Sequence, residues 1–310
     1  MITFRQHLVS LVAVFLALAV GVVLGGGPLS DVGRTSPTAA TTAEAGLEAS
    51  FGDAFAAAAA PALLRDRLAD RSVVVVTLPG ADQEVVDALR ARVEEAGGAL
   101  TGAYSVLPGL LAADEKALVD TLGSQLMTQY AAEEVAADAP TYERLGRLLG
   151  VAVATTDPAG DAAGPRSRSL LDGLAGGGLV QADVAAERRA PLVLVVGGAD
   201  PEPAEATDTD TTDSTDTAEA AAAGDAILTG LLAGLRQGAA GVALVGTTEA
   251  GAEGRLGRVR QDDALVDVTT VDGAETVVGQ VTTVLALARA LDGTAGDFGA
   301  SGADGAVPLG

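Results

Sequence analysis

Cysteine and tryptophan are absent from the 310-residue sequence, which has a single histidine, His7, and a single lysine, Lys116. Without cysteine the chain cannot form a disulfide or a thiolate metal site. Nucleophile–base pairs of the usual kinds also need a histidine or a substitute within hydrogen-bond reach of the nucleophile. We therefore expect no catalytic residue, no bound cofactor and no enzymatic activity.

Positive charge is scarce, because 19 Lys and Arg residues face 42 Asp and Glu residues, which gives a formal net charge of -23. Nucleic acid repels a chain with such an acidic balance. Aromatic residues make up only 3% of the sequence, so no basic stripe with interleaved aromatics occurs. The sequence excludes nucleic acid as a partner.

Charged residues are missing from one long stretch near the start. The apolar run over residues 8–24 spans about 26 Å at about 1.5 Å per residue, close to the hydrocarbon core of about 30 Å. A secretory leader has a shorter apolar run with a cleavage site close behind it, whereas the nearest A-x-A pattern here is at residues 43–45. We predict an uncleaved transmembrane helix within residues 1–30. A cleaved leader and a buried core helix are the alternatives.

Basic residues flank this run unevenly. Arg5 precedes it, and Arg34 follows it close to Asp31. This bias favours an N-terminus in the cytoplasm. The expected location is therefore the plasma membrane, with a single pass through the lipid bilayer and the bulk of the chain extracytoplasmic.

One stripe of the predicted membrane helix carries only small side chains. The stripe repeats every four residues, at Ala13, Ala17, Gly21 and Gly25. Small residues on one face let two helices approach closely in lipid. The stripe predicts self-association and a homo-oligomer, although Ala and Gly abound throughout the chain.

Beyond the membrane run, residues 31–71 are predicted to form a spacer and an Ala-rich helix interrupted at Pro61. Residues 72–293 then alternate apolar strands with helical patterns. Strands are expected within 72–82, 99–107, 190–200, 239–251 and 263–272, and helices within 82–98, 114–126, 224–238 and 274–293. This alternation is typical of an α/β domain with a doubly wound, mostly parallel Rossmann-like sheet.

Two segments are expected to lie outside the packed fold. Residues 199–222 are rich in Thr, Asp and Glu and are predicted to be an acidic disordered insertion. Asp208, Asp210 and Asp213 resemble the start of a calcium-binding loop, but the required glycine and terminal glutamate are missing. Residues 294–310 read as a Gly-rich tail.

Open α/β sheets bind their ligands in loops beyond the carboxyl ends of the strands. Glycine turns occur there at Pro79-Gly80, at Gly197-Gly198 and at Gly246. None is a G-x-G-x-x-G or a Walker P-loop, and ordinary turns explain them. Adjacent carboxylates at Glu133-Glu134 and Asp262-Asp263 are best explained as solvated faces. An enzyme using carboxylates at this edge is the remaining catalytic alternative.

Both ends of the chain resemble one known family. The start, "FRQHLVSLVAVFLALAVGVVLGGGPLSD", looks like the N-terminus of the actinobacterial copper transporter family of the mycobacterial copper transport protein B type. The ending, "LALARALDGTAGDFGASGADGAVPLG", is similar to that family's close, with a G-x-aromatic-G turn at residues 296–299. The resemblance implies an envelope protein of copper transport, efflux or homeostasis, with a pore in the outer envelope as a further possibility.

The residue types fit direct copper binding poorly. Cu(I) prefers thiolate or thioether ligands, and Cu(II) favours imidazole. The chain offers no cysteine, His7 at the membrane edge, and two methionines, Met1 and Met127. We expect copper contact to be indirect or through carboxylates, or a partner to supply the ligands, so the metal ligands stay unassigned. The alternative function is an anchored scaffold that binds other envelope proteins.

Overall fold

The computed structural model describes residues 37–198 and 213–309, and the chain divides into two compact units between Ala54 and Phe55. The predicted membrane helix, with Ala13, Ala17, Gly21 and Gly25, lies outside the described residues. Nothing in the described ranges is both long enough and apolar enough, as a helix, to cross a membrane.

The first described element is the Ala-rich helix α2, Pro37–Leu64, which contains Pro61 without ending there. The predicted interruption at Pro61 is therefore wrong, and part of the predicted spacer is helical. A proline removes one backbone hydrogen bond from a helix, while Ala60 and Leu64 at this end of α2 are fully buried. Burial of that last turn offsets the cost.

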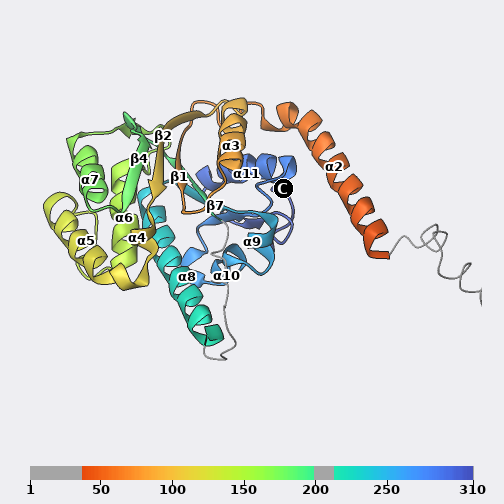
Figure 1. Ribbon diagram of the computed structural model, residues 1–310. Coiled ribbons are helices and arrows are strands. Elements are labelled where there is room, and N and C mark those ends of the chain that lie inside the picture. Colours follow the sequence, from red (N-terminus) through yellow and green to blue (C-terminus); the bar gives the residue numbers. More distant parts are fainter. Residues whose placement is uncertain (1–36, 199–212, 310) are drawn as a thin grey trace, which may run out of the picture. The chain divides into compact units, whose positions relative to one another are not determined.

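The second unit contains one seven-stranded sheet with the order β4-β2-β1-β6-β7-β8-β9 (Figure 1). Its strands are β1 Ser72–Thr77, β2 Ala99–Val106, β4 Val180–Val184, β6 Leu192–Val196, β7 Gly241–Val245, β8 Thr269–Val271 and β9 Asp297–Phe298. Neighbouring strands are parallel except β4, which runs antiparallel to β2. A separate short pair joins β3 Asp161–Ala162 to β5 Arg188–Arg189. The predicted α/β fold with a mostly parallel sheet is confirmed.

Helices cover both faces of the sheet. They are α3 Gln83–Glu95, α4 Pro108–Leu111, α5 Lys116–Tyr130, α6 Thr141–Val153, α7 Pro165–Gly176, α8 Asp213–Gly238, α9 Thr248–Ala252, α10 Arg255–Val259 and α11 Val277–Leu291, with 3-10 turns η1 Ala113–Glu115 and η2 Asp263–Leu265. Helices α5, α6 and α7 lie to one side of the sheet, and α3 and α11 lie to the other (Figure 1).

The central strand explains why the fold has two cores. Val74 and Val76 of β1 pack with the helices α5 to α8, and Val73 and Val75 pack with α3 and α11. Because a strand alternates its side chains between faces, a sheet covered on both sides needs a continuous apolar run. That requirement accounts for the four consecutive valines.

Helices α6 and α8 meet along glycines. A Cβ atom built on Gly146 would lie 2.0 Å from the carbonyl oxygen of Leu231, and one built on Gly234 would lie 2.0 Å from that of Glu143. Gly150 and Gly238 are also in near contact through their backbones. We call this close approach the glycine seam. It brings two helix backbones nearer than any larger side chain would permit.

The structure corrects both segments that were expected to lie outside the fold. Helix α8 begins at Asp213, so residues 213–222 of the predicted disordered insertion are helical, and residues 199–212 lie outside the described residues. Alanines 220–223 are strong helix formers that extend a helix whose later turns are buried. In the predicted Gly-rich tail, Asp297–Phe298 forms the edge strand β9 beside β8.

Candidate functional site

The carboxyl edge of the parallel strands is the expected place for a ligand in a doubly wound sheet, at the point where the strand order reverses. Here that point lies between β1 and β6. A Cβ on Gly198 would lie 2.0 Å from the carbonyl oxygen of Pro79 and 2.7 Å from the carbonyl carbon of Gly80. The two strand-end loops therefore touch through their backbones at Gly198.

The space beside this contact is small. A cavity of about 20 Å³ is lined by Leu78, Gly197, Leu244 and their neighbours, which is room for about one water molecule. The predicted interpretation of these glycines as ordinary turns agrees with this geometry. Close backbone approach, more than any ligand, explains glycine at position 198.

Asp272 is the most deeply buried carboxylate of this edge and directly follows β8. Its side chain is fully buried and forms an ion pair with Arg260, whose Nη2 lies 3.1 Å from Oδ1. The backbone N–H of Ser301 donates to Oδ2 over 3.0 Å, and the hydroxyl of Ser301 lies 3.1 Å from the same oxygen. A buried charge of this kind is tolerated because it is paired and hydrogen-bonded.

Arg260 extends this network to the C-terminal segment. Its Nε donates to the Thr270 hydroxyl over 2.6 Å, and its Nη2 donates to the carbonyl oxygen of Phe298 over 2.8 Å. The Thr270 hydroxyl in turn lies 2.6 Å from a carboxylate oxygen of Asp297. The network joins β8, the residue after α10 and β9, so it locks the C-terminal segment onto the sheet.

The glycines of the G-x-aromatic-G turn are required by this packing. Gly299 has φ +109°, and a Cβ there would lie 2.1 Å from Oδ1 of Asp272. Gly251 of α9 approaches Asp272 from another element, with a virtual Cβ 2.4 Å from the Asp272 Cβ. Glycine supplies both the backbone conformation and the space. The turn that carries the family resemblance thus encloses a buried carboxylate.

A second carboxylate of the same edge is also used internally. Glu275 accepts the backbone N–H of Thr248 at the start of α9, over 3.0 and 3.2 Å to its two oxygens. Thr276 caps α11 by accepting the N–H of Gly279 over 3.0 Å. These groups accept hydrogen bonds from backbone N–H groups at helix N-termini. Their role in this structure is therefore to stabilise the two helices.

The adjacent carboxylates singled out in the sequence serve local structure. Glu134 forms an ion pair with Arg166 at 2.5 Å. Asp262 accepts the N–H of Ala264 over 3.0 Å at the start of η2. Lys116 is exposed at the first position of α5. Glu134, Asp262 and Lys116 form no hydrogen bond or ion pair with one another in the described part of the chain.

Metal-ligating side chains are dispersed in the part of the chain that the structure describes. No group of three or more His, Cys, Asp or Glu residues in that part is placed to hold a metal ion. Met127 lies half-buried on α5, and Met1 and His7 fall outside the described ranges. The metal ligands remain unassigned.

Burial shifts three titratable groups. Desolvation raises the pKa of Tyr104, against the smaller opposing effect of its hydrogen bond from the N–H of Ala186 at 3.0 Å. Desolvation also raises the pKa of Tyr142, with a further contribution from the negative charge of Asp114. Burial lowers the pKa of Arg147, which the nearby Glu134 partly offsets. None of the three residues belongs to a strand-end loop.

Sequence reasoning missed the Asp272 network. Asp272 was assigned only to the end of an expected strand, and Arg260 was not singled out. The one sequence feature that could have drawn attention to Asp272 is its position directly after a buried strand. Nothing in the spacing indicates that Arg260 folds back onto it.

Comparison with known proteins gives one consistent family. The model of the copper transport outer membrane protein MctB matches residues 1–308. Copper transporter MctB of Mycobacterium tuberculosis and that of Mycobacterium bovis are each 30% identical over 321 residues, covering 94% of both chains. Copper transporter MctB of Mycobacterium leprae is 29% identical over 314 residues, again covering 94% of both chains.

Proposed function

Because the chain belongs to the MctB copper transport family, we propose that it is a non-catalytic, membrane-anchored envelope protein that acts in copper transport or copper homeostasis. The similarity over nearly the whole of both chains is the observation that carries this proposal. It includes both the apolar run near the start and the C-terminal turn around Asp272. The family description also supports a location in the membrane or envelope.

The chemistry of the chain suggests how copper enters the function. Copper is the cargo or the sensed ion, and a soft-ligand site would need Cys, Met or His side chains. The sequence has no cysteine, one histidine and two methionines. We propose that copper contact is indirect or through carboxylates, or that a partner protein supplies the ligands.

The proposed role is tested by deleting the gene and measuring cellular copper by mass spectrometry. We expect altered copper content and altered copper tolerance, with both restored by the full chain. Unchanged copper handling after deletion would contradict the proposal. A control metal such as zinc should stay unchanged in the same cells.

The anchor is proposed to be the apolar run at residues 8–24. Its test is carbonate extraction of membranes that contain the full chain, which should stay in the pellet. A variant with Leu16→Arg and Val20→Arg adds about 2.5–3.5 kcal/mol of insertion cost per arginine and should be extracted. The control variant Leu16→Phe with Val20→Leu should remain in the pellet. Extraction of the unmodified chain would refute the anchor.

Self-association is proposed to use the small-residue face of Ala13, Ala17, Gly21 and Gly25. Crosslinking in native membranes should capture a homo-oligomer that Gly21→Leu weakens, because a larger side chain separates the two backbones. Ala19→Leu is the matched control on another face and should leave the crosslink intact. Equal crosslinking of all three proteins would contradict this interface.

An anchored scaffold for envelope proteins is the second candidate. Phe55, on the part of α2 that belongs to the second unit, is 67% exposed. Exposed aromatic side chains are enriched where proteins bind one another. Normal copper handling together with altered cell shape after deletion would favour the scaffold.

A further inference from the structure

A cleft of about 490 Å³ opens at the edge where the parallel strands begin. The segment from Asp66 to Arg71, which joins α2 to β1, forms one wall, and the C-terminal part of α11 forms another. Pro158 and Pro308 contribute from two further parts of the chain. The volume falls in the range of small-ligand sites, about 300–1,000 Å³.

Three guanidinium groups line this cleft, those of Arg67, Arg71 and Arg289. The Nε of Arg67 donates to the carbonyl oxygen of Leu63 over 3.1 Å, and Nη1 of Arg71 donates to that of Pro158 over 2.8 Å. Among the described residues, neither Arg67 nor Arg71 forms an ion pair with a carboxylate. By contrast, eight other arginines do so, namely Arg90, Arg92, Arg144, Arg166, Arg189, Arg255, Arg258 and Arg260.

The charge balance within the cleft is positive although the whole chain is acidic. Asp66 and Asp292 are the carboxylates of the lining, and both are exposed. Arg71 and Arg289 are half-buried, so solvent screens their charges less than it screens those of the two aspartates. Arg289 also stacks over the Phe298 ring at 5.6 Å and lies in the last turn of α11, where its charge compensates the helix dipole.

The segment that carries Arg67 and Arg71 is held in one conformation. Asp66 and Asp70 both have φ 59°, a left-handed conformation that aspartate adopts more readily than most residues. Between them, Leu68 is fully buried, and its N–H donates to the carbonyl oxygen of Ala96 over 3.0 Å. A fixed backbone keeps the guanidinium groups at the cleft before any ligand arrives, which lowers the entropic cost of binding.

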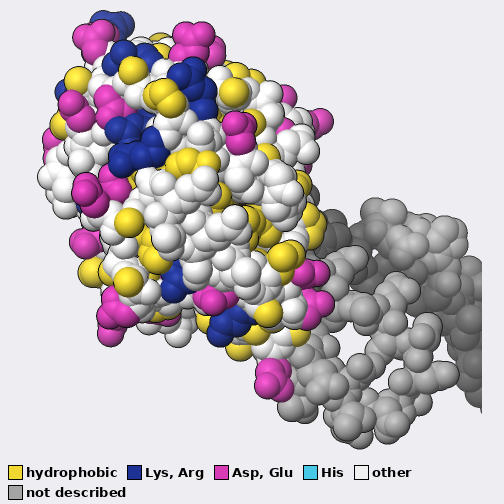
Figure 2. Space-filling view, turned by 90° about the vertical axis from the view of Figure 1, so that its left-hand side faces the viewer, with side chains coloured by type: hydrophobic (Ala, Val, Ile, Leu, Met, Phe, Trp, Pro, Cys, Tyr) yellow, Lys and Arg dark blue, Asp and Glu magenta, His cyan; other side chains and the backbone are white. Residues whose placement is uncertain are grey.

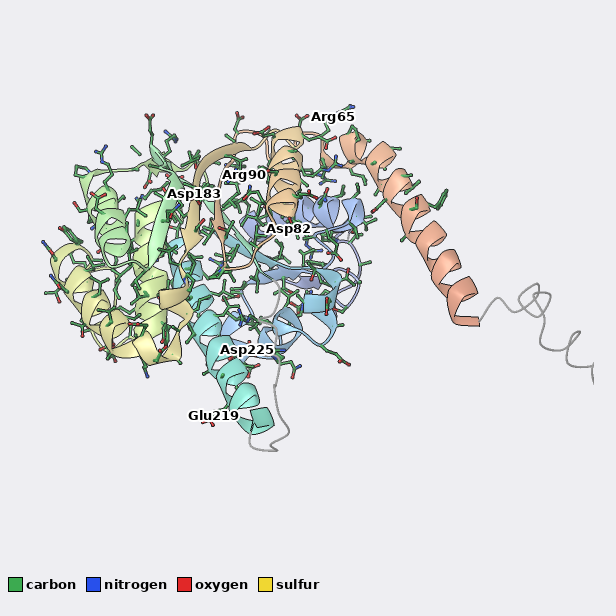
Figure 3. All side chains as sticks on the ribbon, viewed as in Figure 1. Arg65, Asp82, Arg90, Asp183, Glu219 and Asp225 are labelled. Carbon is green, nitrogen blue, oxygen red and sulfur yellow. The ribbon has the colours of Figure 1, made fainter. Side chains whose placement is uncertain are left out.

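Arginine also gathers at this edge of the molecule. Figure 3 labels Arg65 and Arg90 near the upper edge, with Asp183 and Asp82 a little below them, and Asp225 and Glu219 on α8 at the lower end. Figure 2 shows Lys and Arg side chains concentrated in the upper part of the face that it displays. Asp and Glu side chains lie among them in the same part of Figure 2, so the basic groups of this edge are interspersed with acidic ones.

We propose that this cleft binds a phosphate-bearing ligand between Arg67, Arg71 and Arg289. Planar guanidinium groups donate pairs of parallel hydrogen bonds to phosphate oxygens. Leu285 and Leu291 of α11 add apolar lining for the group that bears the phosphate. A soluble phosphorylated molecule and the headgroup of an anionic lipid share this chemistry. The inference goes beyond the copper role and does not depend on it.

The test uses the full chain in phosphatidylcholine nanodiscs, titrated with pyrophosphate by isothermal calorimetry. We expect saturable binding that weakens at least tenfold in Arg67→Gln, a substitution at an exposed side chain that leaves the buried core unchanged. Arg168→Gln removes the same charge from an exposed site on α7 and should bind like the unmodified chain. Thermal unfolding of both variants checks that they are folded.

A second titration in phosphatidylglycerol nanodiscs distinguishes the two sources. A weaker apparent affinity for pyrophosphate there would show that the lipid headgroup competes for the cleft, and an unchanged affinity would indicate a soluble ligand. Absence of saturable binding in the phosphatidylcholine discs would overturn the proposal. Undiminished binding by Arg67→Gln, or equal weakening by Arg168→Gln, would overturn it as well. A copper phenotype in cells bears on none of these outcomes.

Discussion

The glycine seam between α6 and α8 makes the substitution Gly234→Ala a sensitive probe of the fold. The new Cβ would lie 2.0 Å from the carbonyl oxygen of Glu143, 2.7 Å from the backbone nitrogen of Arg147 and 2.8 Å from the carbonyl carbon of Glu143. All three are backbone atoms, so no side-chain rotation can make room. Ordinary contact begins at 3.4 Å, and the difference, 3.4 - 2.0 = 1.4 Å, is the local separation the helices must accept.

The expected loss of stability follows from two opposing terms. Overpacking of this kind costs about 1–3 kcal/mol, and more where backbone must move. Alanine in place of glycine within a helix returns about 1 kcal/mol. Separation of the helices also loosens the packing of Leu231 and Leu235, which are both buried. We expect Gly234→Ala to lower the free energy of unfolding by about 2 kcal/mol.

The assay is urea unfolding of the full chain followed by circular dichroism. A loss of about 2 kcal/mol should lower the midpoint at an unchanged slope, and in a thermal scan it should lower the Tm by about 4–8 °C. Gly176→Ala is the matched control, because a Cβ at that position on α7 meets nothing within 4 Å. It should leave stability unchanged or raise it. Equal or greater stability of Gly234→Ala would refute the reasoning from backbone contact.

Three further outcomes follow from the buried groups. Asp272→Asn removes the closer of the two carboxylates paired with Arg260 and leaves only Asp297 at 3.7 Å, which should cost about 3 kcal/mol and expose the C-terminal segment to limited proteolysis, whereas exposed Asp292→Asn should do neither. Because burial raises the pKa of Tyr104 above its ordinary value near 10, the unfolded state ionises first, so stability should fall as the pH rises beyond about 10. Tyr104→Phe should make that pH dependence shallower, while Tyr142, whose pKa is also raised, retains part of it, and an unchanged slope in the variant would contradict the reasoning. Equilibrium dialysis should find no Cu(I) site of micromolar or higher affinity in the purified full chain, and detection of one would overturn the ligand argument.

Most strands and helices of the fold could be predicted from local patterns of apolar residues. The four valines of β1 predict a strand buried on both faces, and the apolar spacing of 274–293 predicts α11, because both patterns satisfy the packing of a covered sheet. Residues 127–189 were assigned no element, although they form α6, α7 and the antiparallel strand β4. In α6 the glycines at 146 and 150 weaken the helical signal locally. They exist for contact with α8, which sequence periodicity does not report.

The candidate site was less predictable, because its residues meet only through folding. Arg260 and Asp272 come from different elements, and their partner Ser301 belongs to a segment whose glycine content is typical of an unstructured tail. Gly299 is there because Asp272 leaves no space for a side chain. The cleft of Arg67, Arg71 and Arg289 joins the two ends of the domain in the same way. Because these arginines are far apart in the sequence, their spacing does not indicate that they meet in the folded chain.

The position of β9 near the C-terminus means that the sheet is completed late during synthesis of the chain. Residues 297–301 supply both the edge strand and the hydrogen bonds that enclose Asp272. During synthesis they emerge after every other strand of the sheet, so until then a nascent chain holds an aspartate and an arginine in its interior with incomplete partners. Such an intermediate is less stable than the finished domain and easier to keep unfolded. Under the proposed extracytoplasmic location, this late addition of β9 would delay complete folding until the chain has been exported.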